Sequence, residues 1–280
     1  MPDIERVERF SLASDSAIAE ADSLQLEAYA FYYALTRTAE DVSAGHTGIE
    51  PNLGGNLLYA GELDVRGRAM AIAGNVAGCA MLAATADVAT QKQAIRDGAV
   101  DFVVTSLDEA LRILKNEIRK RCTVAVCVGA APANVEREMI ERGVLPDLVF
   151  EGRPGDPGGV PPFGVDSRVI RLAEPDSKLA FLKWQVTQAP ARWMVRLDTI
   201  ALDCVQSDLW AHRWIRLSPR YCGRSAQAQR VLYCDPESAK QIVERFSAAV
   251  KYGAIETDVL ASLTIGDETM ESRLSCARPA

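Results

Sequence analysis

Residues 57–84, LLYAGELDVRGRAMAIAGNVAGCAMLAA, are the stretch from which the fold can be predicted. Two short apolar runs, Leu57–Ala60 and Ala80–Ala84, flank a segment rich in small residues, Gly67–Ala77, which is typical of a closely packed helix. A helix between two strands carries the chain back across the sheet, so the second strand runs parallel to the first. The stretch therefore predicts a βαβ unit.

The same alternation of strand and helix continues as far as residue 150. Ser106 and Glu109 match a capping box, in which the serine oxygen accepts a free helix N–H and the glutamate reaches back toward the cap. The alternation predicts an α/β protein with a Rossmann-like, doubly wound parallel sheet of about five strands. Its further elements are a helix at Val88–Arg96, a strand at Asp101–Thr105, a helix after Ser106, a strand at Thr123–Val128, a helix at Val135–Arg142 ending at Gly143, and a strand at Asp147–Phe150.

The flanking regions divide the chain into three parts. We expect an N-terminal helix and loop in 1–56, the Rossmann-like dinucleotide-binding-type domain in 57–165, and a smaller mixed α+β region in 166–280. Asp235-Pro236-Glu237 is a strong helix start, because it combines an N-cap acceptor, a proline at the first position and an acid in the first turn. The other predicted elements are helices at Ser16–Thr38 and Lys178–Gln188 and strands at Thr199–Asp203 and Gln229–Cys234.

Composition excludes several classes of function. The chain has 280 residues, 25% of them charged, and a net charge of −7, which disfavours nucleic-acid binding because that requires a basic surface. There is no apolar run long enough to cross a membrane and no signal-peptide pattern, so we expect a cytoplasmic protein without a membrane partner. The seven cysteines lack metal-ligand spacing, so we expect reduced thiols and no metal.

The turn after the first predicted strand is the candidate phosphate-binding loop. A helix N-terminus binds phosphate through its free N–H groups, and glycines let the backbone approach the ligand. Gly61 and Gly67 remain in this turn, but Glu62 and Asp64 would repel a phosphate. The turn is therefore either a cofactor-binding loop, with Gly61, Asp64, Val65, Arg66 and Gly67 as candidate contacts, or an ordinary βα turn.

Two further positions are open to two interpretations each. Asp87 stands where an acid could hold a ribose, and it could equally cap the next helix. The Gly/Pro-rich segment Gly152–Gly164 leaves the carboxyl end of the fifth predicted strand, where open α/β sheets bind ligands. It is either part of a ligand site or a linker.

Several motifs between about residue 45 and residue 235 resemble urocanase. The specific part of the likeness comprises Gly74–Cys79 (GNVAGC), Ser106–Lys120 and Arg142–Val149, continued by Asp156-Pro157 and Pro161–Gly164. A weaker part comprises Pro219–Gly223 (PRYCG), Arg230 and Asp235–Glu237. The first part resembles the NAD-binding domain of the family, and the second resembles a segment of its core.

The resemblance implies NAD as cofactor, acting as an electrophile in the hydration of urocanate, and a homodimer. The family's ribose-binding glutamate falls on Thr85, and its Gly-Asn-Ala turn falls on Gly129-Ala130-Ala131. Its Asp-Gln-Thr-Ser loop falls on Glu151-Gly152-Arg153-Pro154. Residues that determine the fold are kept, whereas residues that would contact the cofactor have changed. Ala130, Ala131, Gly152, Arg153 and Pro154 complete the candidate cofactor contacts.

Cys222 is the candidate catalytic residue, because the essential cysteine of the urocanases falls on it. Arg220 and Arg224 flank it, and nearby cations favour the reactive thiolate. His46 and His212 are the two histidines, and without an identifiable partner we interpret them as surface residues. We expect the tryptophans of the last region to anchor its core or an oligomer contact.

Three functions remain open from the sequence. The first is a urocanase-like hydratase that uses a dinucleotide and Cys222 on a small unsaturated or imidazole-like acid. The second is a non-catalytic, urocanase-derived binding or regulatory protein. The third is an NAD(P)-dependent oxidoreductase in which Arg66 or Arg153 accepts an anion. In each case we expect a small-molecule ligand and a homo-oligomer.

Overall fold

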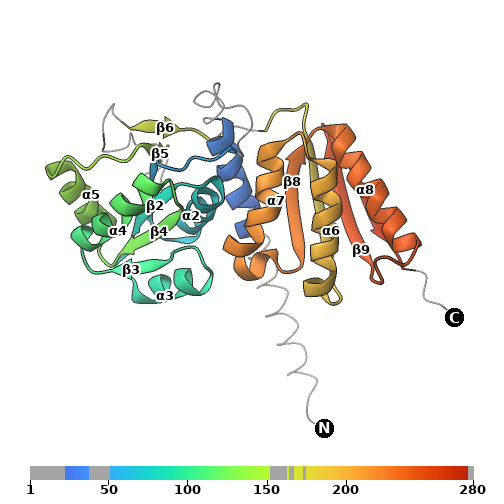
Figure 1. The fold of residues 1–280 in the computed structure, drawn as a ribbon, viewed down its shortest axis with the longest axis horizontal. Helices are drawn as coiled ribbons and strands as arrows, with labels where there is room; N and C mark the ends of the chain where they lie inside the picture. The colour runs from blue at the N-terminus through green and yellow to red at the C-terminus, as the bar shows by residue number, and fades with distance from the viewer. Residues whose placement is uncertain (1–22, 38–50, 152–162, 164–166, 173–174, 277–280) are drawn as a thin grey trace, which may run out of the picture.

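The structure is a computed structural model, and it describes residues 23–37, 51–151, 163, 167–172 and 175–276, apart from the side chains of residues 224 and 225. A parallel sheet occupies the first half (Figure 1), and its strand order is β3-β4-β2-β1-β5-β6. The predicted α/β fold is therefore confirmed. The strands are β1 Leu57–Glu62, β2 Ala80–Ala84, β3 Phe102–Val104, β4 Val124–Val128, β5 Leu148–Phe150 and β6 Arg168–Ile170.

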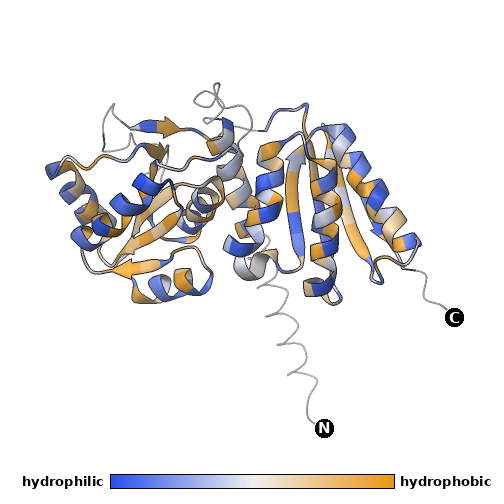
Figure 2. Cartoon of the chain, viewed as in Figure 1, coloured by the Kyte–Doolittle hydropathy of each residue, from blue (hydrophilic) through white to orange (hydrophobic). Residues whose placement is uncertain are grey.

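Alternate residues of the strands face two separate helical layers. Leu58, Ala60 and Met81 share a core with α2 (Val65–Ala77), whereas Leu57, Tyr59 and Val126 share another core with α4 (Leu107–Lys120) and α5 (Pro132–Glu141). A sheet covered on both faces needs apolar strands, which is why β4 is largely orange in Figure 2. The short helix α3 (Val88–Arg96) leads into the edge strand β3.

The C-terminal part forms a second sheet, which is antiparallel and has the order β10-β9-β7-β8. Its helices lie side by side across one face of the sheet (Figure 1). The strands are β7 Ala180–Val186, β8 Gln229–Cys234, β9 Val259–Ile265 and β10 Glu268–Leu274, and the helices are α6 Pro190–Cys204, α7 Leu209–Tyr221, the 3-10 turn η2 Gly223–Ala226 and α8 Pro236–Lys251.

Two of the predicted elements in this part are wrong. Lys178–Gln188 was expected to be helical but contains β7, in which buried and half-buried residues alternate as they do in a strand with one covered face. Thr199–Asp203 was expected to be a strand but lies inside α6, whose buried residues include Trp193, Leu197 and Ala201, spaced four apart. The strand Gln229–Cys234 and the helix start at Asp235 are confirmed.

The helix of residues 23–37 lies between the two sheets and packs against both. The Phe31 ring meets the Phe150 ring at the end of β5 with 4.7 Å between centroids, and Tyr29 meets Trp214 of α7 at the same distance. The Tyr29 hydroxyl also accepts a hydrogen bond from the Tyr233 N–H at 2.8 Å, which satisfies an edge position of β8. One continuous apolar core consequently includes residues of both sheets.

Candidate functional site

Four predicted site segments follow strands that are neighbours in the parallel sheet. Strands β1, β2 and β4 are adjacent in the parallel sheet, so the described turns after their carboxyl ends lie along one edge. Gly61–Gly67, Thr85–Asp87 and Ala130-Ala131 belong to these turns. The predicted contacts Gly152, Arg153 and Pro154 follow β5 but lie outside the described residues.

Asp64 occupies the helix N-terminus at which a phosphate would bind. It is the N-cap of α2, and its Oδ1 accepts a hydrogen bond from the Gly67 N–H at 2.8 Å. In a phosphate-binding loop such an N–H points at the ligand. A second anion about 4 Å from this carboxylate would be repelled by about 4 kcal/mol at an effective dielectric constant of about 20.

The two glycines of this turn serve the packing of the backbone. A Cβ on Gly67 would lie 1.9 Å from the Glu62 carbonyl oxygen, so only glycine lets α2 begin so close to β1. Gly61 has a φ of 75° and lies where the β1–β2 register shifts, between Tyr59 and Gly61. The glycines are therefore explained without a ligand.

The positions predicted to hold a ribose are also engaged within the fold. Asp87 caps α3 by accepting the Ala89 and Thr90 N–H groups, each at 3.1 Å, and the hydrogen bonds of Thr90 and Ala89 lower the pKa of this carboxyl. Thr85 is buried, and its hydroxyl accepts the Asp87 N–H at 3.2 Å. Of the two interpretations of Asp87, the geometry supports the helix cap.

The remaining candidate cofactor contacts are Arg66, Val65, Ala130 and Ala131. The Arg66 guanidinium lies 5.5 Å from the centre of the Phe31 ring, so it faces the helix of residues 23–37. Val65 is exposed. The Ala130 N–H donates to the Val128 carbonyl at 2.8 Å. Ala131 is the N-cap residue of α5, and its side chain makes no capping hydrogen bond. Neither alanine offers a polar side chain to a ligand.

A cavity of about 450 Å³ lies beside Asp64, between the first turns of α2 and α3. The α3 residues that line it were not predicted as site residues, because their spacing also fits an ordinary solvated helix face. Within this cavity Arg68 is paired with Asp97 at 3.0 Å, so the Asp64 carboxylate dominates the charge presented to a ligand. The lining residues are Leu63, Asp64, Val65, Arg68, Ala89, Thr90 and Gln93.

Cys222 lies elsewhere in the fold. It is the C-cap of α7 and only 3% exposed. A Cβ on the adjoining Gly223 would lie 3.0 Å from the Asp97 carbonyl, and Asp97 is where the chain turns from α3 toward the amino end of β3. Cys222 thus adjoins the amino side of β3, whereas the predicted cofactor turns follow carboxyl ends of strands.

The described residues give no sign of a metal site or a membrane span. None of the helices in these parts of the chain is both long and apolar enough to cross a bilayer. Within the same ranges, no three His, Cys, Asp or Glu residues gather closely enough to hold a metal ion.

A doubly wound parallel sheet with helix N-termini at its carboxyl edge defines a Rossmann-like α/β domain. Residues 36–152 match the family model described as the Urocanase Rossmann-like domain. The matched segment contains β1 to β5, and the predicted resemblance to the urocanase Rossmann-like domain is confirmed over it. A domain of this kind is consistent with NAD binding, but the Asp64 carboxylate at the start of α2 does not fit a pyrophosphate.

The residues that carry the resemblance have structural roles. A Cβ on Gly74 would lie 2.6 Å from Cδ2 of Leu58, and the Asn75 amide donates to the Ala99 carbonyl at 3.0 Å. The Asp147 carboxylate accepts the Leu57 N–H at 2.7 Å, which ties β5 to β1. These residues therefore hold helix and strands together and do not indicate that the cofactor is bound.

Proposed function

We propose that this chain is a non-catalytic, urocanase-derived binding protein that holds a small molecule lacking a pyrophosphate at the carboxyl edge of its parallel sheet. The observation that carries the proposal is the hydrogen bond from the Gly67 N–H to Asp64, which fills the anion position of α2. The match over residues 36–152 supports the inherited scaffold, and the altered turns support a changed ligand.

The cavity beside Asp64 suggests the chemistry of this ligand. Leu63, Val65 and Ala89 provide apolar contacts, and Thr90 and Gln93 provide groups that can form hydrogen bonds. The Asp64 carboxylate favours a hydrogen-bond donor or a positive charge. A phosphate-free, nucleoside-sized molecule with exposed N–H or O–H donors fits these groups.

Calorimetric titration of the full chain with NAD⁺, ADP-ribose and adenosine tests this proposal. We expect no binding of NAD⁺ or ADP-ribose to the wild type, because Asp64 repels the phosphates. Asp64→Gly frees the Gly67 N–H at a cost of only a few tenths of a kcal/mol in capping, and should gain measurable affinity for ADP-ribose. Asp64→Asn is the matched control, since it keeps the cap and the N–H stays occupied. Tight binding of NAD⁺ to the wild type would overturn the proposal.

The second candidate is a urocanase-like hydro-lyase with Cys222 as its catalytic residue. The family match over residues 36–152 favours it. Its test is the consumption of urocanate by the wild type in the presence of NAD⁺, and the loss of this activity in Cys222→Ser. A matched control is Cys122→Ser, which changes an exposed cysteine. Turnover that disappears only in the Cys222 variant would favour this candidate over the binding protein.

A further inference from the structure

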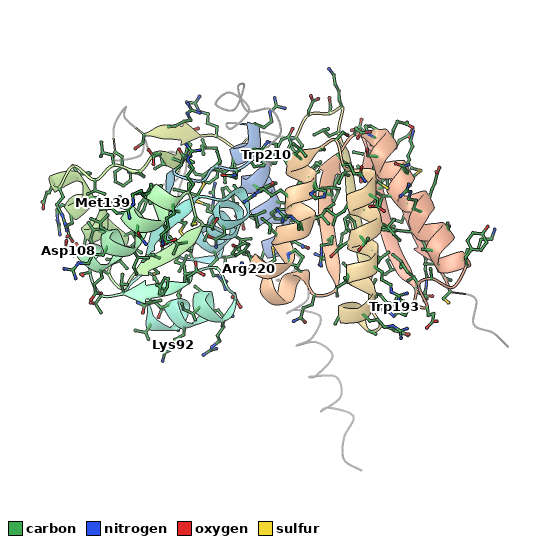
Figure 3. All side chains as sticks on the ribbon, viewed as in Figure 1. Lys92, Asp108, Met139, Trp193, Trp210 and Arg220 are labelled. Carbon is green, nitrogen blue, oxygen red and sulfur yellow. The ribbon has the colours of Figure 1, made fainter. Side chains whose placement is uncertain are left out.

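A second cavity lies where the helix of residues 23–37, the start of α7 and strand β8 meet. Its volume is about 190 Å³, and five aromatic residues together with Asp208 line most of it. We call it the aromatic pocket. Trp210 is labelled in Figure 3 at the beginning of α7, next to the N-terminal helix. The aromatic residues are Tyr29, Tyr32, Tyr33, Trp210 and Tyr233.

The walls of the aromatic pocket are fixed by contacts among themselves. The Tyr32 hydroxyl donates a hydrogen bond to the Trp210 carbonyl at 2.8 Å, and the two rings meet edge to face at 6.1 Å. The Tyr29 ring stacks on Tyr233 at 5.4 Å while its hydroxyl bonds the Tyr233 backbone. A ligand would therefore meet rings that are already held in place, which limits the entropy lost on binding.

Asp208 places a carboxylate in this aromatic surrounding. It is the N-cap of α7, and its Oδ1 accepts the Ala211 N–H at 2.9 Å. The Asp208 side chain is half-buried, and this burial raises the pKa of its carboxyl. The electrostatic attraction between a carboxylate and a cation is stronger in such a setting than at an open surface.

The Tyr33 wall already faces a cation supplied by the chain itself. Arg37 also lines the aromatic pocket, and its guanidinium lies 6.0 Å from the centre of the Tyr33 ring. Aromatic faces attract cations through the ring quadrupole, and groups of such rings recognise quaternary ammonium ions. The geometry of this wall is thus compatible with cation–π contact.

We propose that the aromatic pocket binds a small organic cation of the ammonium type, with Asp208 as its counterion and the rings of Tyr32, Tyr33 and Trp210 as its walls. A quaternary ammonium has no N–H to lose hydrogen bonds on entering an aromatic cavity, so this class fits best. The site is separate from the cavity beside Asp64 and does not depend on the function proposed for that edge.

Choline and its uncharged carbon isostere, 3,3-dimethyl-1-butanol, test the charge requirement on the full chain by calorimetric titration. The two molecules have nearly the same shape, so a cation site should bind choline at least about tenfold more tightly, as expected for one cation–π and ion-pair site of about 1.4 kcal/mol. No detectable choline binding, or equal affinity for the two molecules, would overturn the proposal.

Substitutions then locate the site. Asp208→Asn keeps a good N-cap for α7 and removes the charge, so the protein should remain folded and its choline affinity should fall about tenfold. Tyr33→Leu removes a wall and should also weaken binding, whereas Tyr33→Phe keeps the ring face and should not. Asp203→Asn, which removes an exposed carboxylate on α6, is the control for net charge. Choline binding that is unchanged in both Asp208→Asn and Tyr33→Leu would contradict the assignment.

Discussion

At the scale of single residues, Asp64 determines what the carboxyl edge of the parallel sheet can accept. From the sequence, its charge could be predicted to repel a phosphate. The structure adds that the same carboxylate accepts the Gly67 N–H, which is the group a phosphate would need. This hydrogen bond could not be derived from the sequence, because the direction of a side chain in a turn depends on the surrounding backbone.

The substitution Gly67→Ala should destabilise the protein by more than about 3 kcal/mol, because the new Cβ would lie 1.9 Å from the Glu62 carbonyl and the backbone would have to move. Gly143→Ala is a matched control, since Gly143 has a φ of 63° and a Cβ added there would meet no atom within 4 Å. It should cost only about 1–2 kcal/mol of left-handed strain. Urea unfolding of both variants measures the difference, and equal losses would contradict the role assigned to Gly67.

Asp198 predicts a pH dependence of stability. It is paired with Arg230 at 2.8 Å, yet desolvation outweighs the attraction of Arg230 and raises the pKa of the carboxyl to about 6. The folded protein thus holds this proton more tightly than the unfolded chain, whose carboxyl pKa is about 4. The contribution of Asp198 is therefore full below pH about 4 and falls by up to about 3 kcal/mol as the pH rises to about 6.

Urea unfolding between pH 4 and pH 7 measures this effect. The wild type should lose stability over this range relative to Asp198→Asn, which cannot titrate. Asp203→Asn serves as control, because Asp203 is an exposed aspartate on the same helix. A stability difference between wild type and Asp198→Asn that does not change with pH would show that the carboxyl titrates normally.

At the scale of helices and strands, the sequence predicted an element best when all of its residues have the same surroundings, as in a strand that is buried on both faces. The strands β1, β2 and β4 are buried on both faces, and their uniform apolar runs predicted them correctly. In β7 the pattern AFLKWQV includes a lysine and a glutamine on the less covered face, which also fits an amphipathic helix. Strand β6 has three residues, of which only Ile170 is buried, so its apolar run was too short to be predicted as a strand.

We predict that the contact between α2 and α7 depends on Arg213. Its Nε donates to the Val76 carbonyl at 2.6 Å, so a cation from α7 satisfies the C-terminus of α2. Arg213→Met should destabilise the protein by about 2–3 kcal/mol, because the α2 carbonyl loses a charged donor. Arg216→Met is the control, since it changes an arginine in the next turn of α7. Thermal unfolding that is equal in the two variants would contradict this role.

At the scale of the whole molecule, one apolar core spans the two regions, 57–165 and 166–280, that the sequence predicted as separate domains. The helix of residues 23–37 and α7 contribute to a core that contains strands of both sheets. This joint core, the place of Cys222 and the aromatic pocket all arise from contacts between distant segments, which local sequence patterns do not specify. The common edge of the three described turns, which follow β1, β2 and β4, could be predicted, because parallel strands bring their carboxyl ends to the same edge.

The continuous core predicts cooperative unfolding of the full chain. Residues on both sheets lose their packing together, so differential scanning calorimetry should give one transition with equal calorimetric and van't Hoff enthalpies. Two resolved transitions would show that the sheets unfold independently. The predicted homo-oligomer is not tested by the structure. Because association makes the melting temperature depend on protein concentration, sedimentation at several concentrations should accompany the calorimetry.

The affinity of the full chain for NAD⁺ is the measurement that decides whether Asp64 closes the anion site of α2. We expect the protein purified from cells to carry no NAD⁺ by native mass spectrometry, and added excess NAD⁺ to produce no bound species and no rise in melting temperature. A ligand at about 100 times its Kd would stabilise the fold by about 2.7 kcal/mol, which such an experiment resolves easily. Co-purified NAD⁺, or a stoichiometric complex on its addition, would contradict the conclusion that Asp64 has closed the anion site of α2.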